Sequence, residues 1–135
     1  MLFVDTSVWS LAFRRDTIPH NAEVQYLQSL LKAGGQITTT GLVLQELLQG
    51  FAGASAAEAI ISRFRAIPIL SPNREDHIAA AALRNTCRQS GVQVGTIDAV
   101  IAQLCVRHDV ELLTTDQDFR HMQKLVPQLK MWPGK

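Results

Sequence analysis

Four acidic residues stand beside apolar runs, where a carboxylate could do chemistry. They are Asp5 after LFV, Glu46 within LVLQELL, Asp98 within IDAVIAQL and Asp116 after LLTT, with Asp118 two residues further on. A carboxylate at the edge of a core is costly unless it is paired or bound to a metal. Oxygen ligands of this kind favour a hard divalent cation such as Mg²⁺ or Mn²⁺, which can activate water and stabilise charge on a phosphoryl group.

Each of these acids also has an ordinary structural interpretation. Asp5 could be a turn or cap residue, and Asp98 could be a first-turn acid favoured by the helix dipole. Glu46 could be a solvated position on an amphipathic helix. The placement of all four at such junctions is what favours a shared site.

The elements that must position these acids alternate along the chain. The pattern predicts strands at 2–5, 36–39, 67–70, 111–114 and 129–132. It predicts helices at 8–13, 20–33, 41–50, 58–66, 74–90, 98–108 and 120–126. A polar break at 14–19, a flexible stretch at 52–57 and a tight acidic loop at 115–119 separate some of them. Strands alternating with helices indicate an α/β fold with a parallel sheet of four to five strands, in one domain spanning 1–135.

The expected site is the carboxyl edge of this sheet, where open α/β folds bind their ligands. Asp5 ends the first strand and Asp116 follows the LLTT strand, so both belong at that edge. Hydroxyls flank them and could hold a water or a phosphate oxygen, or simply cap and close turns. These hydroxyls belong to Thr6, Ser7, Thr114 and Thr115.

The cationic residues do not identify a partner by themselves, because the net charge is only +1 and produces no global basic field. Five arginines are candidate phosphate contacts or solvated surface groups: Arg14, Arg15, Arg84, Arg88 and Arg120. The four histidines share no motif and are not assigned to the site: His20, His77, His108 and His121.

The rest of the composition favours a cytoplasmic protein. Cys87 and Cys105 lie in helical stretches, so we expect free thiols in a reducing compartment rather than a zinc site. The start MLFVDTSVW lacks the charged and long apolar regions of a signal peptide. No apolar run reaches the roughly 18 residues of a membrane span.

Four strings carry a resemblance to a known family. VDTSVW at 4–9, LVLQELLQG at 42–50, IDAVIAQL at 97–104 and LLTTDQDF at 112–119 resemble, in this order, PIN-domain ribonucleases and most closely VapC-type toxins of bacterial toxin–antitoxin pairs. The resemblance covers essentially the whole chain and implies a three-layer α/β/α fold. It implies that Asp5, Glu46, Asp98 and Asp116 are the catalytic and metal-binding acids. It gives supporting roles to Thr6, Ser7, Thr115 and Asp118.

The activity implied by this resemblance is that of a Mg²⁺- or Mn²⁺-dependent endoribonuclease that attacks with activated water and forms no covalent intermediate. It also implies a homodimer and a small VapB-like antitoxin that covers the active site. Two surfaces are compatible with such partners, although their residues could equally be ordinary core. They are Trp9, Leu11 and Phe13 near the acidic edge, and Ile78, Ala81, Ala82 and Arg84 on the 74–90 helix.

Other α/β classes fit the sequence less well. A receiver domain needs an acidic pair after the first strand, where Thr6 and Ser7 stand, and a phosphatase of the Asp-x-Asp type needs an acid at position 7. A PIN domain that binds RNA or protein without cutting stays open as an alternative, as does a housekeeping RNA-processing nuclease, which would share every catalytic residue.

Overall fold

A short parallel sheet forms the centre of the computed structural model, which describes residues 1–14 and 21–134. Its strands are β1 (Leu2–Val4), β2 (Ile37–Thr38) and β3 (Glu111–Leu113), in the order β2-β1-β3. Phe3 of β1 lies opposite Thr38 on one side and Leu112 on the other. The helices are α1 (Thr6–Phe13), α2 (Ala22–Ala33), α3 (Gly41–Gly50), α4 (Ala54–Arg65), α5 (Arg74–Gln89), α6 (Thr96–His108) and α7 (Gln117–Gln123).

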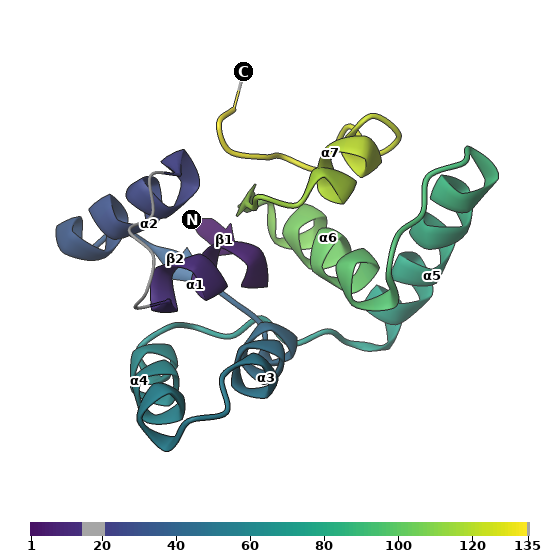
Figure 1. The fold of residues 1–135 in the computed structure, drawn as a ribbon. Helices are drawn as coiled ribbons and strands as arrows, with labels where there is room; N and C mark the ends of the chain where they lie inside the picture. The colour runs from purple at the N-terminus through teal and green to yellow at the C-terminus, as the bar shows by residue number, and fades with distance from the viewer. Residues whose placement is uncertain (15–20, 135) are drawn as a thin grey trace.

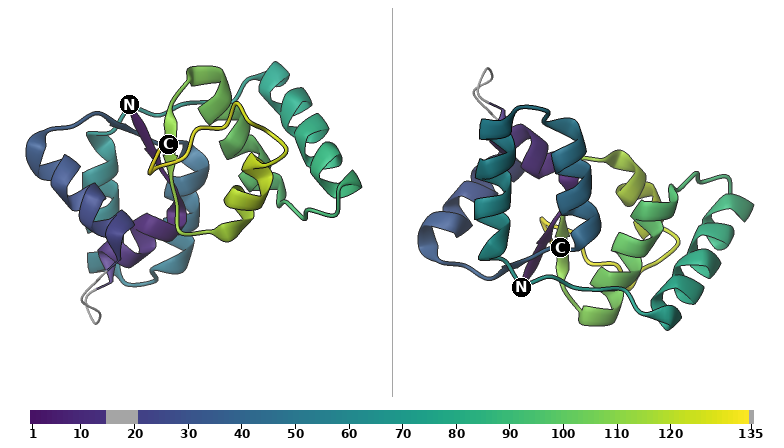
Figure 2. Two further views of the ribbon diagram at one scale, coloured as in Figure 1. Left: turned by 90° about the horizontal axis from the view of Figure 1, so that it is seen from above. Right: turned by 90° about the horizontal axis from the view of Figure 1, so that it is seen from below.

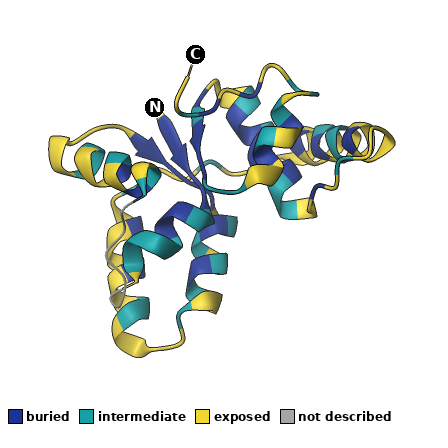
Figure 3. Cartoon of the chain, turned by 45° about the horizontal axis from the view of Figure 1, so that its top comes forward, coloured by how far each residue is buried: buried dark blue, intermediate teal, exposed yellow. Residues whose placement is uncertain are grey.

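Helices cover the sheet on both sides, as the resemblance implied. Helices α1 to α4 gather on one side of the strands, and α5 to α7 gather on the other (Figures 1 and 2). The strands and the inner faces of these helices form the buried centre (Figure 3), with Phe3, Val4 and Leu113 fully enclosed. The α/β class with an α/β/α arrangement is therefore confirmed.

The expected number of four to five strands was too high for the described residues, which form three strands and two single bridges. Ile69 bridges to Thr39 at one edge, and Met131 bridges to Leu112 at the other. The expected strands at 67–70 and 129–132 thus contribute one parallel pairing each. Pro68 explains the first case, because proline has no N–H to donate to a ladder.

Several helix ends differ from the expected ones. Helix α4 begins at Ala54, so the 52–57 stretch is partly helical, and α7 begins at Gln117 inside the expected acidic loop. Helix α6 has Gly95 rather than Thr96 at its cap. Helix α2 begins after Asn21, which accepts from Val24 N at 2.9 Å. The polar break and the helix start expected at 20 involve residues 15–20, which lie outside the described residues.

Thr6 and Ser7, which could have capped α1, lie inside the helix instead. Thr6 is the first residue of α1, and Asp5 occupies the cap position without a side-chain capping bond. Trp9 is 1% exposed and packs on Phe64 at 5.0 Å between ring centroids, so it belongs to the core and not to a partner surface. Ile78 on α5 is, in contrast, 58% exposed.

The two cysteines are free and buried, as expected. Burial raises the pKa of both thiols. Within the described parts of the chain, no helix is long and apolar enough to cross a membrane.

Candidate active site

The acids predicted from the sequence come together at the carboxyl edge of the sheet. Asp5 directly follows β1, and its N–H donates to Leu113 O of β3 at 2.9 Å, which places the two strand ends side by side. Asp116 caps α7 just beyond β3, and its Oδ1 accepts from Asp118 N at 2.9 Å. Asp98 lies in the first turn of α6.

The tightest part of the group joins α6 to α7. One carboxylate oxygen from each of Asp98, Asp116 and Asp118 lies within 4.8 Å of the other two. Three oxygen donors at this spacing suit a hard divalent cation. Asp118, expected only in a supporting role, is therefore a full member of this cluster, whereas Asp5 and Glu46 lie around it.

A network of hydroxyls holds Asp5. Its Oδ2 accepts from Ser7 Oγ at 2.9 Å and from Thr114 Oγ1 at 2.8 Å, and the two hydroxyl oxygens are 3.3 Å apart. The same hydroxyls accept from the following loop, Ser7 Oγ from Thr115 N at 3.1 Å and Thr114 Oγ1 from Asp116 N at 3.0 Å. Ser7 and Thr114 thereby tie the end of β1 to the loop after β3.

Glu46 belongs to the site through a separate contact. Thr6 Oγ1 donates to Glu46 Oε1 at 2.8 Å, and this bond joins α1 to α3 across 40 positions of sequence. The carboxylate is half-buried, not a fully solvated helix position. The supporting hydroxyls thus divide: Thr6 holds Glu46, and Ser7 holds Asp5.

The site is short of positive charge. The pKa of Asp98 rises from 3.8 to about 7, chiefly through burial and then through repulsion from Asp5, Asp116, Glu46 and Asp118. Burial also raises the pKa of Asp5, against the opposing effect of the bonds from Thr114 and Ser7. In the part of the chain that the structure describes, none of these acids forms an ion pair with lysine or arginine. Clustered, partly buried carboxylates without a cation fit a bound divalent ion.

The histidines and most of the candidate arginines lie elsewhere. His77, His108 and His121 are exposed and outside the acidic cluster. Arg14 is exposed, and Arg120 donates to Trp132 O at 2.8 Å. His20 and Arg15 lie outside the described residues.

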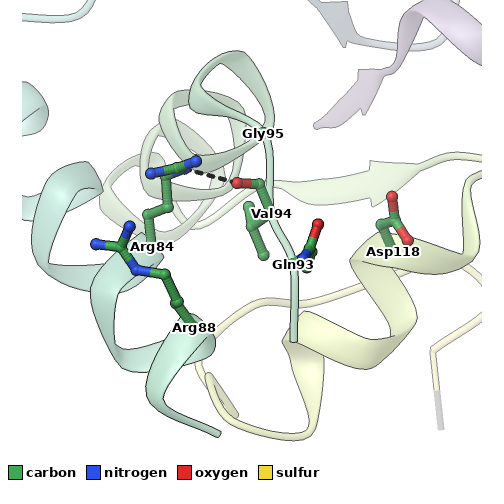
Figure 4. Close-up of a pocket in the computed structure, with 6 residues that line it drawn as sticks. All are labelled: Arg84, Arg88, Gln93, Val94, Gly95 and Asp118. Carbon is green, nitrogen blue, oxygen red and sulfur yellow. Dashed lines mark hydrogen bonds between the residues drawn. The ribbon is translucent and has the colours of Figure 1, made fainter. Parts of the chain in front are cut away.

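Arg84 and Arg88 are different, because they line a cavity that reaches Asp118 (Figure 4). Gln93 and Gly95 also line it, and sequence reasoning missed both. The GVQVG loop that carries them showed no motif that could have indicated the role.

Comparison with known proteins places these features in a family context. The model of the PIN domain family matches residues 2–125. The VapC ribonuclease Mb1587 of Mycobacterium bovis and ribonuclease VapC11 of Mycobacterium tuberculosis are each 28% identical to this chain over 121 residues, which is 88% of this chain and 89% of the relative.

Solved structures share the fold at lower identity. VapBC2 from Rickettsia felis, bound to a promoter DNA fragment, has a TM-score of 0.73 at 19% identity and covers 97% of both chains. FitAcB from Neisseria gonorrhoeae has a TM-score of 0.73 at 19% identity, covering 97% of this chain and 96% of that one. VapC20 of Mycobacterium tuberculosis, a toxin that cleaves the sarcin–ricin loop, has a TM-score of 0.67 at 19% identity over 89% and 93%.

Proposed function

This chain belongs to the PIN domain family, and we propose that it is a divalent-cation-dependent endoribonuclease of the VapC type. One observation carries the proposal: carboxylates from four separate elements meet at one sheet edge, and none of them forms an ion pair with a lysine or arginine of the described chain. The names of the relatives, VapC ribonucleases, supply the substrate class.

The residues that would hold the ion, Mg²⁺ or Mn²⁺, are Asp98, Asp116 and Asp118, with Asp5 beside them. When bound, such an ion stabilises charge on phosphate oxygens and lowers the pKa of water. Binding of the ion would favour the carboxylate form of Asp98, whose pKa is raised to about 7 in the ion-free protein, because a nearby cation stabilises the charged form. Catalytic roles for Asp5, Glu46, Asp98 and Asp116, and supporting roles for Thr6, Ser7 and Thr115, are part of this proposal. Asp118, which the sequence suggested only for a supporting role, joins the residues that would hold the ion.

The neighbouring hydroxyls would keep two of these acids in position for the reaction. Ser7 and Thr114 orient the Asp5 carboxylate, and Thr6 orients Glu46. Such bonds fix a side chain before the substrate arrives, which removes part of the entropic cost of the transition state.

The biological partners in this proposal are a small VapB-like antitoxin that covers the acids and a second copy of the chain. Several solved relatives are VapBC assemblies, including those from Rickettsia felis and Salmonella typhimurium. An antitoxin would introduce a basic or aromatic side chain into the acidic edge, because complementary charge favours such a contact. As a toxin, the protein would arrest growth by cutting RNA needed for translation.

The test is cleavage of total cellular RNA by the purified, partner-free protein in Mg²⁺ or Mn²⁺ against EDTA. We expect cuts at discrete positions that require the ion and are lost in Asp5→Asn. The matched control is Asp109→Asn, which removes an exposed carboxylate paired with Lys130. Absence of cleavage by folded protein would favour a PIN domain that binds without cutting, and cleavage without toxicity on expression would favour an RNA-processing role.

A further inference from the structure

A cavity of about 360 Å³ lies beside the acids, between α5 and α7. Arg84 and Arg88 of α5 line one side, and Asp118 of α7 stands on the other, with Gln93 and Val94 between them (Figure 4). This volume lies within the range of sites that hold small ligands or parts of larger ones.

The cavity is continuous with the acidic cluster. Asp118 belongs both to the cavity lining and to the group of oxygens shared with Asp98 and Asp116. Gly95, another lining residue, lies against Asp98: a Cβ placed on it would be 3.8 Å from Asp98 Oδ2. A molecule in the cavity would therefore lie directly beside any group held at the acids.

The two arginines are oriented but not neutralised. Arg84 donates its Nε–H to Val94 O at 2.7 Å, and Arg88 donates from Nη2 to Asn85 Oδ1 at 2.6 Å. Within residues 1–14 and 21–134, neither forms an ion pair, and the terminal nitrogens of Arg84 make no hydrogen bond. Residues four apart on a helix project from the same face, so the two guanidinium groups present a local positive site next to a negative one.

We propose that Arg84 and Arg88 bind a backbone phosphate of the RNA strand adjacent to the phosphate being cut. This inference rests on the proposed function. An RNA strand is repelled by the acids, and a pair of guanidinium groups beside them offsets that repulsion through charge-assisted bonds to phosphate oxygens. Gln93, with one donor and one acceptor group, is placed to contact the ribose or base of the same nucleotide.

RNA is favoured over an acidic protein segment because the cavity opens onto the acids where the scissile phosphate would lie. A phosphate contact of this kind positions the strand without reading its sequence. The prediction is therefore a loss of affinity that is similar for different RNA sequences and depends on salt.

The experiment measures binding of a short fluorescent single-stranded RNA to the whole chain in EDTA, across a salt series. Arg88→Ala is the clean variant, because Arg88 is exposed and bonds only within its own helix turn. We expect binding about fivefold weaker and a salt slope smaller by about 0.7. Arg84→Lys, which keeps the charge but loses the planar fork, is expected to fall between wild type and Arg84→Ala.

The matched control is Arg63→Ala, which removes one exposed arginine from α4, far from the cavity (Figure 1). It should change affinity by less than about twofold. Wild-type affinity in Arg88→Ala and in the Arg84→Ala/Arg88→Ala double variant would overturn the proposal. Failure of the wild type to bind RNA would also overturn it. So would a result in which Arg63→Ala and Arg88→Ala bind RNA equally well but polyglutamate displaces the RNA only from Arg63→Ala.

The cleavage assay separates this inference from the proposed function. If the protein cuts RNA in a metal-dependent way but binds RNA equally well without both arginines, the nuclease function is supported and the arginine subsite is rejected. If RNA binding depends on the two arginines but the protein cuts no RNA, the arginines are supported as an RNA-binding site and the nuclease function is rejected.

Discussion

Two carboxylates that are withdrawn from water, one fully and one partly, have surroundings that separate their roles. Asp76, between α5 and α6, receives Arg107 Nε at 2.7 Å and Nη2 at 2.8 Å, and it also completes a capping box with Asn73. Asp98, on the same helix as Arg107, lies near other carboxylates and forms no ion pair with a cation of the described chain. In the first arrangement the carboxylate is paired within the fold. In the second, the negative charge is not compensated by an ion pair, and a bound cation could compensate it.

The pKa values of the two groups move in opposite directions for this reason. Burial raises the pKa of Asp76, but the bonds from Arg107, Asn73 and Gln103 outweigh it and leave the value below 3.8. At Asp98, burial and repulsion act together and raise the pKa to about 7. The presence of a paired cation, more than burial, thus distinguishes the structural acid from the proposed catalytic one.

The largest expected effect comes from neutralising the unpaired group. Asp98→Asn should reduce metal-dependent RNA cleavage about a thousandfold, because loss of a cation ligand removes several kcal/mol of transition-state stabilisation. The free energy of unfolding should stay the same or rise in metal-free buffer, since one repelling charge is gone. Cleavage by Asp98→Asn within tenfold of wild type would contradict the comparison.

Removing the cation that pairs with Asp76 should lower stability and leave cleavage unchanged. Arg107→Ala leaves the Asp76 carboxylate buried without its cation, and we expect a loss of about 2 kcal/mol in the free energy of unfolding. This figure is at the low end for a buried pair because the Arg107 side chain is 37% exposed. Urea unfolding measures it, and cleavage per folded molecule should stay near the wild-type rate.

Asp109→Asn is the control for that substitution. It also breaks an ion pair of an aspartate, with Lys130 at 2.6 Å, but on the surface, where both side chains are mostly exposed. Surface pairs contribute little, so unfolding should not change measurably. A loss equal to that of Arg107→Ala would show that burial of Asp76 is unimportant.

The stability of the metal-free protein should depend on pH through Asp98. Between its unfolded value of 3.8 and its folded value of about 7, the folded state holds a proton that the unfolded state has released. The free energy of unfolding therefore falls as pH rises through this window, by about 1–2 kcal/mol after allowance for solvent screening. Asp76 acts with the other sign: its contribution is present above 3.8 and is lost as pH falls through its lowered pKa.

Urea unfolding in EDTA at a series of pH values measures this dependence, and Asp98→Asn isolates the contribution of one group. The variant should show a flatter profile than wild type across the window. An identical profile in both proteins would mean that Asp98 is ionised like any surface acid.

The smallest effect is expected for a positioning hydroxyl. Thr6→Val removes the bond to Glu46 but keeps the shape of the side chain. A single hydrogen bond contributes about 1 kcal/mol, so kcat/KM should fall about fivefold. Thr86→Val, at an exposed position of α5, is the matched control. Unchanged kcat/KM in Thr6→Val would show that Glu46 does not need this contact.

Much of the site could be predicted because its signals are local. Asp5 and Asp116 stand at the ends of apolar strands, and parallel strands bring their carboxyl ends to one edge. Helical spacing was enough to place Glu46 and Asp98 on α3 and α6. These patterns extend over a few residues and can be recognised without knowledge of the packing.

The rest depends on contacts between distant residues. The Thr114 hydroxyl holds Asp5 across 109 positions, so nothing in its own neighbourhood indicates that role. Asp76 lies in the polar string REDH, which is typical of an exposed helix start, yet it is fully buried because α6 presents Arg107 to it. Arg88 could not be separated from Arg120 until the course of the 92–95 loop was known.

The most direct measurement of the central claim is Mn²⁺ binding to the metal-free protein, followed by the electron paramagnetic resonance signal of the free ion. We predict saturable binding that is lost in Asp98→Asn and retained in Asp109→Asn, since only the first change touches the unpaired cluster. Equal binding by wild type and Asp98→Asn, or no binding by any of the three, would contradict the claim that these carboxylates form a cation site.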